Sequence, residues 1–173
     1  EVNLDSGICY KLMKTFSILI CTVFIFSSLN KVWSADLLKG AAAYEKKDYR
    51  TAYKEWLALA RQGDPKAQFF IGNMYYKGVF VSQNDGKAVK WYKRSAEQGL
   101  IKAQNNLGTM YMRGRGIGKN NIKAFIWLHI TAMQGDKIGI KNRDLVAKIM
   151  TLSQIKKATE LATECVKRKY KGC

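Results

Sequence analysis

Small, apolar and aromatic residues recur along this chain with a period of 36 residues. Nine residues between positions 67 and 99 appear again 36 positions later: Ala67, Gly72, Tyr75, Gly78, Ala88, Trp91, Ala96, Gln98 and Gly99 match Ala103, Gly108, Tyr111, Gly114, Ala124, Trp127, Ala132, Gln134 and Gly135. A fixed period of this length is typical of one supersecondary unit stacked on copies of itself. The chain is therefore expected to be a repeat protein.

Each unit is predicted to contain two helices. The first carries an apolar stripe at the i, i+4, i+5 and i+8 positions, formed by Ala67, Ile71, Gly72 and Tyr75. A glycine inside such a stripe weakens the helix, which indicates close approach by a neighbouring helix. The second helix carries a stripe of Ala88, Trp91, Tyr92, Ser95 and Ala96. We expect both tryptophans, Trp91 and Trp127, to lie in the core.

Polar residues and glycines mark the expected helix ends. Asp85 and Asn121 precede the second helices and are expected to accept hydrogen bonds from their free N–H groups. Gly99 and Gly135 follow those helices, where a left-handed residue commonly ends a helix.

The pattern weakens on both sides of these two units. Residues 37–64 carry part of it upstream. Downstream of residue 136, Asn142 is expected to cap a short helix that runs to Met150. Thr151 and Gln154 match a capping box that opens a last helix. One face of that helix is formed by Ile155, Ala158, Ala162, Cys165 and Val166.

The repeated motif Ala-Gln-x-x-Ile/Leu-Gly-x-x-Tyr, followed by Gly, Lys-Ala-x-x-Trp and Ala-x-Gln-Gly, resembles the Sel-1-like repeat family, which is related to tetratricopeptide repeats. Residues 65–100 and 101–136 match as full repeats, 37–64 as a degenerate N-terminal repeat and 137–173 as the closing helices. The resemblance implies an all-α fold, an α/α solenoid of stacked antiparallel helix pairs forming a tetratricopeptide-like superhelix. It covers one domain, residues 35–173. The family's Gly-x-Gly turn is present at Gly114-Arg-Gly116 but becomes Gly78-Val-Phe80 in the preceding repeat, where we expect a loop of different shape.

The start of the chain has a different composition. Lys14 precedes an apolar run from Phe16 to Phe26, and Ser34 offers a small residue before a cleavage point, as in a secretory signal peptide. The run is shorter than the roughly 20 apolar residues of a membrane span. We predict a signal peptide at 13–34, with a retained anchor as the alternative. Residues 1–12 are interpreted as a non-native upstream extension. A periplasmic or secreted protein is expected.

The chain is strongly basic, with 30 Lys and Arg against 13 Asp and Glu, a net charge of +17. Residues 1–34 hold three lysines and two acidic residues, so their removal leaves 27 basic and 11 acidic residues, net +16. Such a charge favours acidic protein partners and anionic envelope surfaces. The alternative is that the lysines only solvate helix faces. Nucleic acid is not an expected partner of an exported protein.

Two cysteines, Cys165 and Cys173, remain after signal removal and are expected to form a disulfide. On one straight helix they would lie about 12 Å apart, so the helix must end before Cys173. The alternative is a buried Cys165 and a frayed tail. These cysteines and the lone His129 do not make a four-ligand zinc site, and neither a metal nor a cofactor is expected.

Catalytic motifs are weak. Ser153-Gln-Ile-Lys156 satisfies the Ser-x-x-Lys pattern of penicillin-recognising enzymes, but the Ser-Asp-Asn and Lys-Thr-Gly elements are missing. The glycine-rich segment 114–119 has the wrong spacing for a phosphate loop. His129 is interpreted as a structural histidine with satisfied hydrogen bonds. No catalytic residue is expected, and a penicillin-binding or β-lactamase-like hydrolase is kept as the alternative function.

The first helices of stacked pairs line the concave side of a solenoid, which is where such proteins usually bind. Side chains off the packing stripe are therefore expected to bind an acidic or C-terminal segment of a partner protein: Phe69, Asn73, Tyr76, Lys77, Asn105, Thr109 and Arg113. Asn73 and Lys77 lie one helical turn apart and can grip a carboxylate together. For Phe69 and Tyr76 partial burial is the alternative. The expected function is an exported protein-binding adaptor or scaffold.

Overall fold

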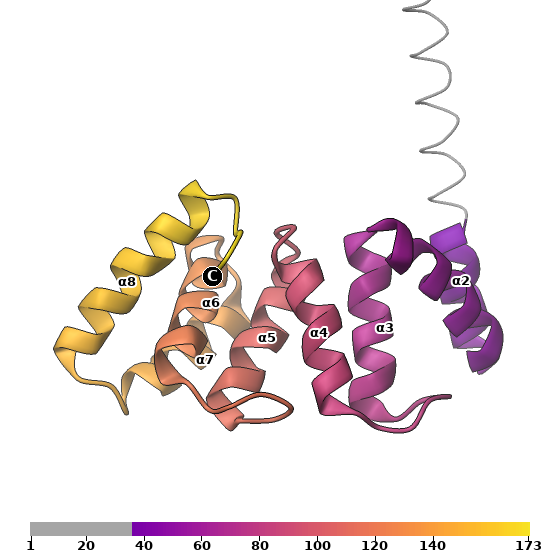
Figure 1. Ribbon diagram of the computed structural model, residues 1–173, viewed down its shortest axis with the longest axis horizontal. Coiled ribbons are helices and arrows are strands. Elements are labelled where there is room, and N and C mark those ends of the chain that lie inside the picture. The colour runs from indigo at the N-terminus through magenta and orange to yellow at the C-terminus, as the bar shows by residue number, and fades with distance from the viewer. Residues whose placement is uncertain (1–35) are drawn as a thin grey trace, which may run out of the picture.

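The computed structural model describes residues 36–173, which form helices and turns without a strand among them (Figure 1). The predicted signal peptide, 13–34, and upstream extension, 1–12, lie outside the described residues. After a helical segment at 36–45, the elements are α2 (Tyr49–Gln62), α3 (Pro65–Lys77), α4 (Asp85–Ala96), α5 (Ile101–Arg113), α6 (Asn121–Met133), α7 (Lys137–Ala147) and α8 (Leu152–Lys167).

Consecutive helices pack against one another along the chain. The most extensive contacts join α3 to α4 and α5 to α6, the two helices of each predicted repeat. Helices α2, α4 and α6 in turn contact the helix that follows them, and α8 folds back onto α6 (Figure 1). The predicted all-α solenoid of stacked helix pairs is confirmed.

The repeated glycines lie where two helices of one repeat approach closely. A Cβ atom on Gly72 would lie 2.7 Å from Cε1 of Tyr92 on α4, and one on Gly108 would lie 2.7 Å from Cγ of Leu128 on α6. Real Cβ atoms do not make such short contacts, so only glycine fits. The packing reason expected for these glycines is confirmed.

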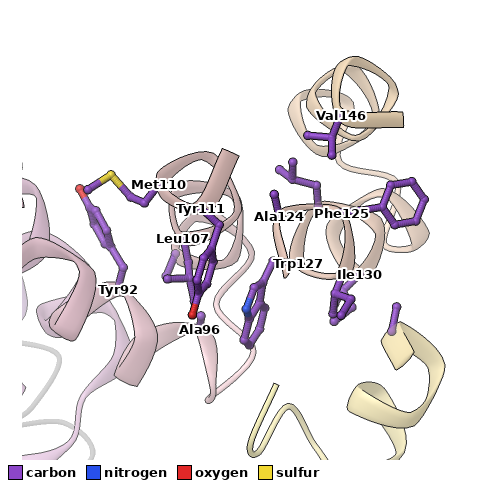
Figure 2. Packing of buried hydrophobic residues seen from close by; sticks show 14 of the residues in the cluster. Tyr92, Ala96, Leu107, Met110, Tyr111, Ala124, Phe125, Trp127, Ile130 and Val146 are labelled. Carbon is purple, nitrogen blue, oxygen red and sulfur yellow. The ribbon is translucent and has the colours of Figure 1, made fainter. Parts of the chain in front are cut away.

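Among residues 36–173 the core has two clusters of buried side chains, one around α2 and α3 and one that runs from α4 to α8. Figure 2 shows the second cluster, into which Tyr111 of α5 and Trp127 of α6 project. The expectation that both repeat tryptophans lie in the core is wrong for Trp91, which is half-buried, whereas Trp127 is 1% exposed. In the earlier repeat Tyr92, one residue further along α4, is the large ring in the core.

The expected caps of the second helices are each wrong by one residue. Oδ1 of Asn84 accepts a hydrogen bond from the Lys87 backbone N–H at 2.8 Å, and Oδ1 of Asn120 accepts one from Lys123 at 2.9 Å. A capping residue has an extended backbone and bonds to the third residue of the helix. Asn84 and Asn120 meet this condition, with φ of −151°. Asp85 and Asn121 instead begin the helices.

Helix α7 spans Lys137–Ala147, so it differs at both ends from the short helix that was expected to be capped by Asn142 and to run to Met150. Helix α7 begins at Lys137, because Oδ2 of Asp136 accepts a hydrogen bond from Gly139 N–H at 2.7 Å. Asn142 therefore lies inside the helix and does not cap it. The capping box of α8 is confirmed: Gln154 N–H donates to Oγ1 of Thr151 at 3.2 Å, and Thr151 N–H donates to Oε1 of Gln154 at 2.9 Å.

The loops inside the two repeats have the same backbone turn, contrary to expectation. Gly78 and Gly114 have φ of 69° and 68°, and Phe80 has φ of 64° where Gly116 has 68°. Left-handed φ is unfavourable for a bulky residue. The ring of Phe80 lies 5.4 Å from the ring of Tyr53 on α2.

Candidate protein-binding face

The side chains expected to bind a partner have very different surroundings. Lys77 and Arg113 are exposed at the C-terminal ends of α3 and α5. Phe69, Asn73, Tyr76 and Thr109 are half-buried, and Asn105 is only 6% exposed. Two positions are therefore freely available to a partner, and the others take part in packing to different degrees.

Asn73 joins three helices. Its Oδ1 accepts a hydrogen bond from the Tyr92 hydroxyl of α4 at 2.7 Å and a longer one from Nδ2 of Asn106 on α5 at 3.4 Å. Burial raises the pKa of the Tyr92 hydroxyl above its ordinary value, so it remains a donor. The side-chain oxygen of Asn73 is thus occupied by contacts within and between repeats.

Tyr76 is held by an arginine that the sequence pattern did not single out. The Arg115 guanidinium lies 4.5 Å from the centre of the Tyr76 ring, and its Nη1 donates to the Tyr76 hydroxyl at 2.9 Å. The same guanidinium binds both carboxylate oxygens of Asp85 at 2.9 and 3.0 Å. Arg115 therefore ties the turn of one repeat to the preceding repeat. In the sequence, only its position between Gly114 and Gly116 marks Arg115 as a residue of the repeat turn.

Asn105 is buried between repeats and is not available to a partner. Its Nδ2 donates to Oδ2 of Asp136 at 2.6 Å, and its Oδ1 accepts from the Thr131 hydroxyl at 2.9 Å. Asp136 uses the same oxygen to cap α7. The expectation that Asn105 lies off the packing surface is therefore wrong, because α7 covers this part of α5.

A hollow of about 280 Å³ lies beside Asn73 and Lys77. Its walls are largely apolar and come from the helical segment at 36–45, α2 and α3; they are formed by Ala41, Tyr44, Glu45, Trp56, Phe70, Asn73, Met74 and Lys77. The charged side chains of this lining are one cation, Lys77, and one anion, Glu45, and the rest is largely apolar, which suits an apolar side chain of a partner.

The C-terminal cysteines form the expected disulfide. Cys165 and Cys173 are bonded, with their Cα atoms 5.7 Å apart. Helix α8 ends at Lys167, and Tyr170 N–H donates to the carbonyl of Cys165 at 2.8 Å as the chain turns back. The turn brings Tyr170 against Gly99, between α4 and α5. A disulfide is typical of an oxidising compartment.

The candidate catalytic positions are isolated from one another. Ser153 and Lys156 are both exposed on the first turns of α8, and no hydrogen bond joins them in the described part of the chain. His129 stacks on Phe125 with ring centres 5.4 Å apart. Its Nδ1 is buried and has no partner within residues 36–173, so the expected satisfied histidine is wrong. Burial, with the nearby positive charge of Arg143, lowers the pKa of this imidazole.

Residues 36–173 contain neither a metal-binding cluster nor a helix that could span a membrane. These residues hold no group of three or more His, Cys, Asp or Glu side chains placed to bind a metal ion. Their helices are each too short or too polar to cross a lipid bilayer.

The chain matches the family model for the Sel1 repeat twice, at residues 65–100 and 101–136. It is similar to the crystal structure of c5321, a protective antigen of uropathogenic Escherichia coli strains with an SLR fold, at a TM-score of 0.75 and 26% identity; the match covers 80% of this chain and 30% of the antigen. It is also similar to a Sel1 repeat protein from Oxalobacter formigenes, at a TM-score of 0.59 and 37% identity, over 62% of this chain and 44% of the other.

The chain thus spans less than half the length of either protein. A comparison with curated protein sequences gives no match. The two family matches coincide with the 36-residue units and with the helix pairs α3–α4 and α5–α6. The chain therefore carries two consecutive Sel1 repeats and folds as a Sel1-like repeat solenoid.

Proposed function

We propose that this protein is an exported adaptor that binds an acidic segment of a partner protein on the inner side of its solenoid. Sel1 repeat proteins generally act by binding other proteins. The first helices of successive repeats contact one another: Asn106 of α5 bonds to Asn73 of α3, and Asn105 of α5 bonds to Asp136 at the cap of α7. These contacts support the assignment of α3, α5 and α7 to the inner side of the solenoid.

The observation that carries the proposal is the hollow of about 280 Å³ along α3. Lys77 stands at its edge, and Arg113 occupies the equivalent place on α5 one repeat later. Both side chains are exposed, so an acidic peptide lying along α3 and α5 would meet these two cations beside the apolar hollow, whose lining includes Glu45 as its one anion. Asn105 is left out of this surface because it is buried.

Lys77 also provides the position for identifying the partner. A photoreactive residue placed there and activated in cells that produce the protein should cross-link a partner for mass spectrometry. The purified partner is then titrated against the parent and against Lys77→Glu combined with Arg113→Glu. Charge-assisted contacts contribute about 1.5–3 kcal/mol each, so affinity should fall more than tenfold while the circular dichroism spectrum and Tm stay unchanged.

The matched control reverses two lysines on another helix, Lys156→Glu with Lys157→Glu, which changes the net charge equally. Both lysines are exposed on α8. If this control weakens the partner as much as the Lys77 and Arg113 pair does, the attraction is diffuse and the proposed face is wrong. Export is tested separately by the intact mass of the protein outside the cytoplasm, which should begin at Ala35 or Asp36.

A further inference from the structure

A second hollow, of about 430 Å³, lies where α3 meets the start of α5. Its walls come from the first turns of α3, from the connection between α4 and α5, and from the end of α6; they are formed by Lys66, Phe69, Phe70, Gly99, Leu100, Ile101, Lys102 and Gln134. The hollow is apolar inside and has lysines at its rim.

The next contact along the solenoid shows why this hollow exists. Phe69 and Leu100 stand 36 residues before Asn105 and Asp136. At the later contact Asn105 donates to Asp136 at 2.6 Å, and this pair closes the space between α5 and α7. At the earlier contact both polar residues are replaced by apolar ones, so the pair is lost and an apolar space takes its place.

The replacement also changes the start of α5. Asp64 accepts a hydrogen bond from Ala67 N–H at 2.7 Å at the start of α3, and Asp136 accepts one from Gly139 N–H at 2.7 Å at the start of α7. Leu100 stands in the same place before α5 and makes no side-chain cap. The start of α5 therefore lacks the side-chain carboxylate that caps α3 and α7, and the Ala103 N–H donates instead to the Leu100 carbonyl at 3.0 Å.

The positive charge at the rim of the hollow is complementary to a carboxylate, the group that is missing before α5. Lys66 and Lys102 occupy the same position of successive first helices, and both are exposed. The side chains that line the hollow include no acidic residue. The rim thus has two cations and no anion, which favours a carboxylate.

We infer that this hollow binds the C-terminal residue of a partner protein, with an apolar side chain against Phe69 and Leu100 and the terminal carboxylate between Lys66, Lys102 and the start of α5. The inference rests on the proposed adaptor function and adds a second contact on the same side of the solenoid. A terminal residue suits the geometry because its apolar side chain and its carboxylate start from one Cα atom. Successive side chains of an extended internal segment point in opposite directions.

The test uses fluorescein-labelled hexapeptides that end in leucine or phenylalanine, each prepared as the free acid and as the C-terminal amide. Fluorescence anisotropy with the full chain should show the free acid binding at least tenfold more tightly than the amide. Lys66→Gln with Lys102→Gln should remove this preference. Hydrogen exchange of the Ile101 and Lys102 amides should slow in the presence of the free acid only.

The decisive variants are Leu100→Asp and the double variant Phe69→Asn with Leu100→Asp. The single variant supplies the missing carboxylate from the chain itself, and the double variant rebuilds the pair seen at Asn105 and Asp136. Both should abolish peptide binding, and the double variant should keep or raise the Tm of the parent, so that the loss cannot come from unfolding. The control is Lys156→Glu with Lys157→Glu, which should bind the peptides as the parent does.

Equal binding of free acid and amide, or undiminished binding by a folded double variant, would overturn the inference. Binding of phosphatidylglycerol vesicles that depends on Leu100 and Lys102, without peptide binding, would also overturn it. If binding of a cross-linked partner is weakened by the Lys77 and Arg113 substitutions but is unchanged by Leu100→Asp, the inference fails while the adaptor function stands. If the peptides bind in the hollow but the Lys77 and Arg113 substitutions weaken the binding of no partner, the proposed binding face at Lys77 and Arg113 is wrong instead.

Discussion

The two repeat tryptophans provide a matched test of the packing. Trp91 and Trp127 are the same residue at the same repeat position, yet Trp127 is 1% exposed and Trp91 is half-buried. Truncation of a fully buried tryptophan to alanine costs about 3–5 kcal/mol because the lost contacts leave a cavity. Trp91 keeps one side in water, where it contacts the Arg94 guanidinium 4.9 Å from a ring centre. Trp91→Ala should therefore cost about 1–2 kcal/mol.

Urea denaturation followed by circular dichroism measures both free energies of unfolding. With a slope of about 2 kcal/mol per molar urea, Trp127→Ala should lower the midpoint by about 1.5–2.5 M and Trp91→Ala by about 0.5–1 M. The slope itself should change little if unfolding stays two-state. Equal shifts for the two variants, or a larger shift for Trp91→Ala, would refute the assignment of Trp127 as the buried member of the pair.

Three further predictions concern the C-terminal half. Cys173→Ser should cost about 2–3 kcal/mol by opening a short loop, and Cys165→Ser should cost more because its buried sulfur is replaced by a hydroxyl; thiol titration of the denatured parent should find no free thiol among residues 36–173. Gly116→Ala should destabilise by more than 1 kcal/mol, roughly the cost of a left-handed alanine, because its φ is 68° and the new Cβ would collide with the backbone of Asp85; thermal unfolding measures this. The pKa of His129 is lowered in the folded state. The contribution of neutral His129 to the free energy of unfolding is therefore fully present above the ordinary pKa of 6.5 and is lost as the pH falls from 6.5 through the folded-state pKa. Urea midpoints between pH 7.5 and 5.5 should therefore fall for the parent and fall less for His129→Phe.

The repeat architecture could be predicted because its signal is redundant. Each helix pair contributes the same small and large residues at the same spacing, so an error at one position does not change the fold. The capping box at Thr151 was predicted for a different reason, since two residues three positions apart make reciprocal hydrogen bonds. Where two polar residues stand side by side, as at Asn84 and Asp85, spacing alone does not decide which of them caps the helix.

The candidate site was harder to predict because helical spacing does not show what the neighbouring repeat covers. Asn105 has the spacing of a surface residue, but α7 covers it. Both ends of its amide are hydrogen-bonded, one to Asp136 at the cap of α7 and the other to Thr131 of α6. Arg115 was missed because its partners, Tyr76 and Asp85, are 39 and 30 residues away. Contacts of this kind depend on how one repeat lies against the next, and a single sequence does not show this.

The two contacts between first helices in this solenoid differ in kind, although the repeats share their core residues. The α5–α7 contact is closed by the partly buried Asn105–Asp136 pair. The chain beyond it is held by the disulfide, whose turn carries Tyr170 back to Gly99. The α3–α5 contact has a half-buried hydrogen bond of 3.4 Å and the apolar hollow. A binding surface needs side chains that packing has not already satisfied. The differences between the two contacts therefore support the binding positions that we propose on α3 and at the start of α5.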